Sequence, residues 1–133
     1  MLPCYYVKYN SSCAVFIFVL TFISCRRQWT DTILLSGHEY SFNANGDSTF
    51  VTSKGTSWWF ADVMLVSTHY FLPQANSNCK LIYIDSNFQI ERRSCDSLFV
   101  KMNINKTNSS RVLWIQLQAG DYFNSIMFTQ NKK

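Results

Sequence analysis

Glycine and proline are scarce in this chain of 133 residues, which contains only 4 Gly and 2 Pro. This scarcity excludes a low-complexity chain. Charged residues are also few, at 15%, whereas hydrophobic residues make up 47%. The chain therefore has too little charge for a disordered protein and enough apolar material for a core, and its length predicts one domain.

The apolar run near the N-terminus is too short to cross a membrane. Residues 14–23 are apolar except Thr21, and a spanning helix needs about 20 such residues. The run fits the hydrophobic region of a signal peptide, with Lys8 as a weak positive flank. Arg26 and Arg27 follow the run, where positive charge opposes translocation.

We therefore predict a signal peptide or a short anchor over residues 1–25 and a secreted, extracellular domain over residues 26–133. Phe22-Ile23-Ser24-Cys25 also resembles a bacterial lipobox, with Cys25 as the lipidated residue. Contact with a membrane is expected only through an uncleaved or lipidated N-terminus.

Cysteine is nearly absent from the expected mature domain. Three of the 5 cysteines precede Arg26, which leaves Cys79 and Cys95. An even count in an exported domain predicts one disulfide between them. There is no second cysteine pair, and His38 and His69 lack the spacing of zinc ligands. We expect no metal and no cofactor.

Motifs of common enzymes are missing. The sequence has no G-x-S-x-G elbow, no P-loop and no dinucleotide fingerprint. His38-Glu39 is not followed by a second histidine at the position of a zinc-protease helix, where Phe42 stands. We expect no catalytic residues and no enzyme. The alternative is a small secreted hydrolase or nuclease that uses His38 and His69 as acid and base.

A basic stripe is also missing, although the net charge is +4. The lysines and arginines are scattered, and only three adjacent pairs occur: Arg26-Arg27, Arg92-Arg93 and Lys132-Lys133. Nucleic-acid binding needs clustered positive charge. We expect no nucleic-acid partner.

The pattern that is present has a period of two, which predicts strands. Residues 98–104 and 112–118 alternate most clearly, and the polar residues 105–110 between them predict a hairpin. Residues 43–47 contain Asn45-Gly46 and predict another hairpin. In residues 58–66, Trp59 shares a face with three apolar residues and is expected in the core. About eight short strands predict an all-β fold, a single antiparallel β-sandwich that is jelly-roll-like or Ig-like.

Two N-x-[ST] sequons lie in the predicted turn between residues 104 and 111. They begin at Asn105 and Asn108. We expect both acceptors to be exposed, and at least one to be glycosylated in a eukaryotic secretory pathway.

The outward positions of the last predicted hairpin combine an aromatic ring with amides. Residues expected on this face are Trp114, Gln116, Gln118, Asn103 and Lys101. A flat ring can take the apolar face of a sugar while amides bond its hydroxyls. The face therefore predicts a module that binds an extracellular glycan. An exposed tryptophan also suits a protein partner, so a secreted effector or interaction factor is the alternative.

Residues 112–120, followed by Asn124, Ile126 and Phe128, resemble the closing strands of jelly-roll carbohydrate-binding modules. In that pattern an alternating apolar strand ends in Ala-Gly and precedes Asn and a second apolar strand. The resemblance implies a sandwich fold and carbohydrate binding. An immunoglobulin domain fits less well, because its cysteines lie far apart around a tryptophan.

Overall fold

The structure, a computed structural model, describes residues 33–133. The expected signal segment, with Cys25, lies outside the described residues. Over the described range the chain forms strands and no helix, so no helix there is long and apolar enough to cross a membrane. The strands are β1 (Glu39–Phe42), β2 (Asp47–Thr52), β3 (Trp59–Leu65), β4 (Thr68–Tyr70), β5 (Leu81–Ile84), β6 (Phe88–Ser94), β7 (Ser97–Met102), β8 (Arg111–Ala119) and β9 (Tyr122–Gln130).

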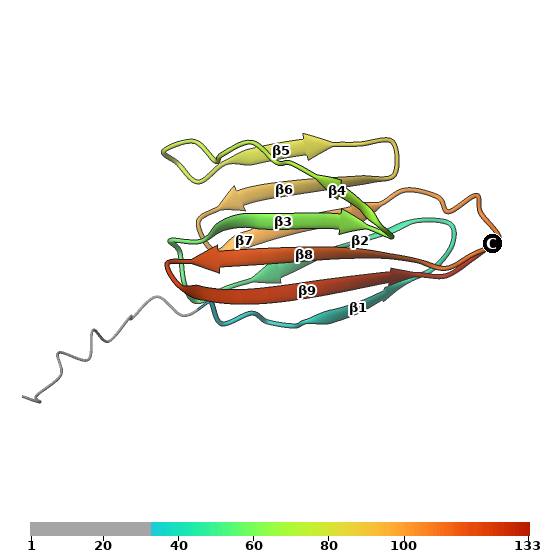
Figure 1. Cartoon of the computed structure of the whole chain (residues 1–133), viewed down its shortest axis with the longest axis horizontal. Helices are drawn as coiled ribbons and strands as arrows, with labels where there is room; N and C mark the ends of the chain where they lie inside the picture. Colours follow the sequence, from blue (N-terminus) through green and yellow to red (C-terminus); the bar gives the residue numbers. More distant parts are fainter. Residues whose placement is uncertain (1–32) are drawn as a thin grey trace, which may run out of the picture.

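Two sheets pack face to face (Figure 1), which confirms the predicted all-β sandwich. One sheet has five strands in the order β1-β9-β8-β3-β4, and the other has four in the order β2-β7-β6-β5. The pairing of β1 with β9 is parallel. The remaining strand pairs of the described chain are antiparallel.

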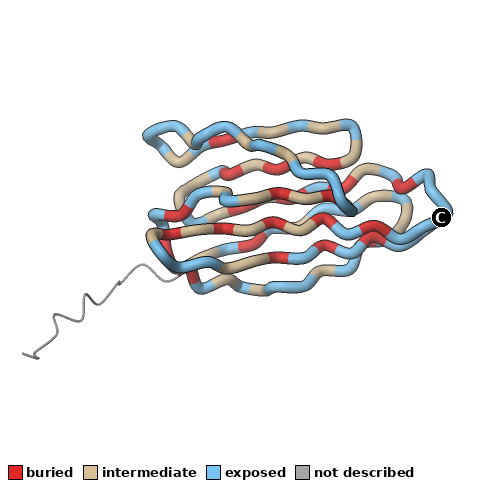
Figure 2. The backbone as a smooth tube through the Cα atoms, in the orientation of Figure 1, coloured by how far each residue is buried: buried red, intermediate tan, exposed pale blue. Residues whose placement is uncertain are grey.

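The core lies between the sheets and follows the alternation of the strands (Figure 2). Leu113, Ile115 and Leu117 of β8 are fully buried, as the period of two predicts. They belong to the same core cluster as Leu98, Val100 and Met102 of the equally alternating β7, which are also buried. A buried aliphatic side chain of this size stabilises the fold by roughly 1.5–3 kcal/mol, so these two strands supply a large part of the hydrophobic stabilisation.

The predicted hairpin between residues 98–104 and 112–118 is wrong. β7 pairs with β2 and β6 in the four-stranded sheet, whereas β8 pairs with β3 and β9 in the five-stranded sheet. The chain therefore crosses between the sheets after β7. The hairpin at Asn45-Gly46 is wrong for the same reason, because β1 and β2 belong to different sheets. Gly46 still needs its glycine, since its φ is 99°.

Asn105 holds the crossing from β7 to β8 in place, and the expectation that its side chain is exposed is wrong. The residue is 0% exposed. Its Nδ2 donates to the carbonyl oxygens of Ser109 at 2.8 Å and Asn131 at 3.0 Å. Its Oδ1 accepts from the hydroxyl of Thr107 at 2.7 Å. The amide that a glycan needs is thus occupied in the folded chain, whereas Asn108 is exposed and glycosylation there stays a prediction.

A β-bulge in β3 reverses which of the two tryptophans, Trp58 or Trp59, points into the core. The register against β8 shifts between Phe60 and Asp62, and a bulge inserts one unpaired residue, which reverses the sides of the residues before it. Trp58 is 2% exposed and Trp59 is 37% exposed. The prediction of Trp59 in the core is therefore wrong. Val63, which lies beyond the bulge, is 1% exposed.

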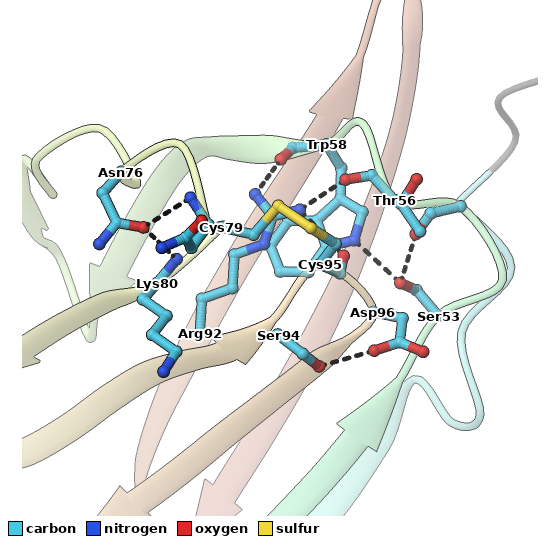
Figure 3. Close-up of a disulfide and its surroundings, with 12 residues drawn as sticks. Ser53, Thr56, Trp58, Asn76, Cys79, Lys80, Arg92, Ser94, Cys95 and Asp96 are labelled. Atoms are coloured by element: carbon cyan, nitrogen blue, oxygen red, sulfur yellow. Dashed lines mark hydrogen bonds between the residues drawn. A yellow bond between two sulfur atoms is a disulfide. The ribbon is translucent and has the colours of Figure 1, made fainter.

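The predicted disulfide between Cys79 and Cys95 is confirmed. It joins the segment before β5 to the turn between β6 and β7, and it lies beside Trp58 and Arg92 (Figure 3). The loop from β4 to β5 has no strand of its own. The cross-link therefore anchors this loop to the sandwich near the point where β3 begins.

Removing the disulfide is expected to lower the free energy of unfolding by about 3 kcal/mol, because the cross-link closes a loop of about 15 residues in the unfolded chain. Urea denaturation of the oxidised protein and of the Cys79→Ala/Cys95→Ala variant measures this difference. The same variant under reducing conditions is the control and should not change. A loss below about 1 kcal/mol would contradict the expectation.

Candidate functional site

The outer face of the five-stranded sheet carries the tryptophan that the sequence singles out. Directly paired residues of neighbouring strands point to the same side of a sheet, so the register defines which side chains lie together. Trp114, Gln116 and Gln118 of β8 alternate with buried residues and all face outward, as predicted. β8 is the middle strand of this sheet, which places these three side chains at the centre of the face.

The strands beside β8 add further aromatic and sulfur side chains. Gln118 lies between Trp59 of β3 and Phe123 of β9. Trp114 lies between Met64 of β3 and Met127 of β9. We call the outer side of the five-stranded sheet that bears these residues the aromatic face; its members are Trp59, Met64, Trp114, Gln116, Gln118, Phe123 and Met127.

The aromatic face has rings at two levels and polar groups between them. Gln118 and Trp114 are four residues apart on one strand, which is about 13 Å. Gln116 lies between these two levels, flanked by Asp62 and Ser125. Phe123 is 50% exposed, and Trp114 is half-buried between its neighbours. The face thus offers separate apolar platforms with hydrogen-bonding groups in the space between them.

The polar groups of the face are partly engaged with each other. His69 of β4 lies next to Met64 in the register, and its Nδ1 is 3.0 Å from each carboxylate oxygen of Asp62. The side-chain Nε2 of Gln118 donates to the carbonyl of Gly120 at 2.9 Å. The hydrogen bond to Gly120 fixes the side-chain amide of Gln118, so the Oε1 of Gln118 is held in one position, where it can accept a hydrogen bond.

Lys101 and Asn103 do not belong to this face, and their predicted association with Trp114 is wrong. Lys101 of β7 pairs with Ser48 and Gln89 in the four-stranded sheet. Asn103 donates its Nδ2 to the carbonyl of Ser86 at 2.9 Å. The prediction is wrong because the chain crosses to the other sheet after β7. Two alternating strands that follow one another in sequence can pair in a hairpin or lie in opposite sheets, and here they lie in opposite sheets.

His38 and His69 are not brought together either, which removes the basis for a hydrolase that uses both. His38 lies beside β9 at the start of β1, where its Nδ1 is 3.1 Å from the carbonyl oxygen of Ser125. His69 is on β4, at the other edge of the five-stranded sheet. Four strand spacings of about 4.8 Å separate the two edges by about 19 Å, too far for joint acid–base chemistry.

The sequence pattern does not place Trp59 and Phe123 on this face. Trp59 was missed because a bulge leaves no trace in a simple alternation. Phe123 could have been placed from the turn, because β8 and β9 are joined by the two residues Gly120 and Asp121, and Gly120 has a φ of 59°. A two-residue hairpin fixes the register and sets Phe123 opposite Gln118.

No group of three or more histidine, cysteine, aspartate or glutamate side chains in residues 33–133 is arranged to hold a metal ion. The two buried arginines of the described chain lie outside the aromatic face. Burial lowers the pKa of Arg92, and burial likewise lowers that of Arg111, against the opposing effect of Asp85. The aromatic face itself offers ring surfaces, the side-chain amides of Gln116 and Gln118, and the Asp62 carboxylate that His69 contacts.

Comparison with known proteins places the fold. No protein family and no curated protein matches the sequence. A protein from Bacteroides thetaiotaomicron, solved by NMR, is similar with a TM-score of 0.57 and 23% identity, over 71% of this chain and 76% of that chain. A Bacteroides ovatus GH5 xyloglucanase, solved with a XXXG heptasaccharide, gives a TM-score of 0.48 and 12% identity, over 77% of this chain and 19% of that chain. The similarity to the first of these proteins supports the sandwich fold of this chain.

Proposed function

We propose that this chain is an extracellular binding module that takes a glycan on the aromatic face. The observation that carries the proposal is the placement of Trp59, Trp114 and Phe123 on one solvent-facing side of a sheet, with Gln116 between them. Aromatic rings offer a large apolar surface with a defined plane. Rings about 13 Å apart along the sheet suit a chain of several sugar units better than one unit.

The extracellular part of the proposal is supported by the disulfide between Cys79 and Cys95. Disulfides persist in oxidising compartments and are rare in the cytosol. The signal segment expected from the sequence agrees with this location, and a glycan is a ligand that such a location makes available.

Replacing Trp114 with alanine is expected to weaken glycan binding at least tenfold, which corresponds to about 1.4 kcal/mol, because the central platform of the face is lost. A glycan array identifies the polysaccharides that the purified, oxidised protein binds, and isothermal titration then compares the variants. Phe50→Ala is the matched control, since Phe50 is an exposed aromatic residue on the four-stranded sheet. It should bind as the unchanged protein does.

Two results would contradict the proposal. One is binding to no glycan, together with recovery of a protein partner that free sugars do not displace. That result would assign the face to protein recognition, for which the adaptable side chains of Met64 and Met127 are also suited. The other is glycan binding that Trp114→Ala leaves unchanged.

A further inference from the structure

A small cavity adjoins the aromatic face where β3 begins. Its volume is about 190 Å³, which is less than the ~300 Å³ at which pockets for drug-sized ligands start. Trp59 belongs both to the cavity and to the aromatic face. The loop that the disulfide anchors also lines the cavity, through Leu72, Pro73 and Ala75. The cavity therefore has room for one small unit of a ligand that lies on the face.

Arg92 of β6 brings a buried positive charge to this cavity. It lines the cavity and is 5% exposed. Its Nη1 donates to the carbonyl of Trp58 at 2.5 Å, and its Nη2 donates to the carbonyls of Thr56 at 2.7 Å and Cys95 at 2.9 Å. The guanidinium also lies 3.7 Å from the centre of the Trp58 ring (Figure 3).

None of these contacts neutralises the charge. The partners of Arg92 are carbonyl oxygens and an aromatic ring, and its Nε has no hydrogen-bond partner. Within residues 33–133, the one arginine that forms an ion pair is Arg93, with Glu91. A buried charge without a counter-ion is unusual, because burial removes its hydration and buried charges are ordinarily paired.

Building on the proposed function, we propose that this cavity binds the carboxylate of a uronic acid unit in the glycan. An arginine that lacks an acidic partner in the protein can take one from the ligand, and arginine–carboxylate hydrogen bonds are among the strongest in proteins. Trp59 connects the cavity to the aromatic face, so the same glycan can occupy both. Gln74 is a further polar side chain of the cavity and can bond sugar hydroxyls.

The first test observes Arg92 directly by NMR. The ¹⁵N-labelled, oxidised protein is titrated with sodium glucuronate and sodium galacturonate, and in parallel with glucose and galactose. The uronates are expected to shift the Nε–Hε resonance of Arg92 and the indole resonance of Trp59, at concentrations at least tenfold lower than the neutral sugars. Equal responses to charged and neutral sugars, or no response of Arg92, would overturn the inference.

The second test changes the charge of the cavity without touching Arg92, whose guanidinium holds three backbone carbonyls. Ala75→Asp places a carboxylate in the cavity wall and is expected to reduce the affinity for uronates at least tenfold. Ser77→Asp is the matched control, because Ser77 is an exposed residue of the same loop that does not line the cavity. If both variants bind uronates like the unchanged protein, the inference is wrong.

The two proposals fail separately. Neutral glycans that bind and depend on Trp114, with no response of Arg92 to uronates, would overturn the cavity inference and leave the proposed function intact. The opposite result is also possible: uronates shift the Arg92 resonance, but Trp114→Ala changes the affinity for no glycan. That result would overturn the binding role of the aromatic face.

Discussion

Trp58→Ala is expected to lower the free energy of unfolding by about 3–5 kcal/mol, the usual cost of truncating a large buried aromatic residue. Trp58 packs edge-on against Phe60 at 5.6 Å between ring centres. Its Nε1 donates to the hydroxyl of Ser53 at 2.9 Å, and its ring lies under the Arg92 guanidinium. The substitution removes the ring and also leaves a buried cation without its aromatic partner.

Trp59→Ala is the matched control. Trp59 is the tryptophan next to Trp58, and its side chain is partly exposed on the opposite side of the sheet. Its loss is expected to cost less than about 1 kcal/mol, because a partly exposed side chain leaves little cavity. Urea denaturation followed by circular dichroism compares the two variants. Equal losses, or a larger loss for Trp59→Ala, would contradict the bulge that the structure places between Phe60 and Asp62.

Arg111→Met is expected to destabilise the protein by about 3–5 kcal/mol, because it removes the donor of the hydrogen bonds that join the two sheets, and each buried acceptor left without a donor costs about 1–3 kcal/mol. Arg111 of β8 is 8% exposed. Its guanidinium bonds Gln130 Oε1 at 2.8 Å on its own sheet. At the edge of the other sheet it bonds Asn87 Oδ1, just before β6, and the carbonyl of Asn103, just after β7, each at 2.7 Å.

Methionine keeps most of the packing volume of Arg111, so the measured loss reports mainly on these hydrogen bonds. Lys101→Met is the control, since Lys101 is an exposed cation of the four-stranded sheet and its replacement is expected to change stability by less than about 0.5 kcal/mol. Thermal unfolding by calorimetry resolves the difference. Similar midpoints for the two variants would show that the network contributes little.

The candidate face was predicted in part. Trp114, Gln116 and Gln118 could be assigned to one face because alternation within a single strand is a local property. Lys101 and Asn103 were assigned to the same face through a pairing of β7 with β8, and pairing is not local. The structure replaces them with Trp59 and Phe123, which reach the face through a bulge in β3 and the register of the β8–β9 hairpin.

The cavity could not be predicted from the sequence. Its residues come from β3, β6 and the loop before β5, and nothing in their spacing indicates that they meet. The adjacent pair Arg92-Arg93 looks like a surface charge cluster in the sequence. Only one of the two is exposed, because successive residues of a strand point to opposite sides and Arg92 points inward.

The sequence by itself determined the class of fold, the inward positions of β7 and β8, and the partnership of Cys79 with Cys95. Each of these depends on the spacing of apolar residues along one strand or on the count of cysteines. Only the tertiary structure decided which strands pair, which tryptophan enters the core, and that Asn105 is buried. Those outcomes depend on contacts between segments that are distant in sequence. An alternating pattern specifies which residues of a strand face the core, but it does not specify the partner strand.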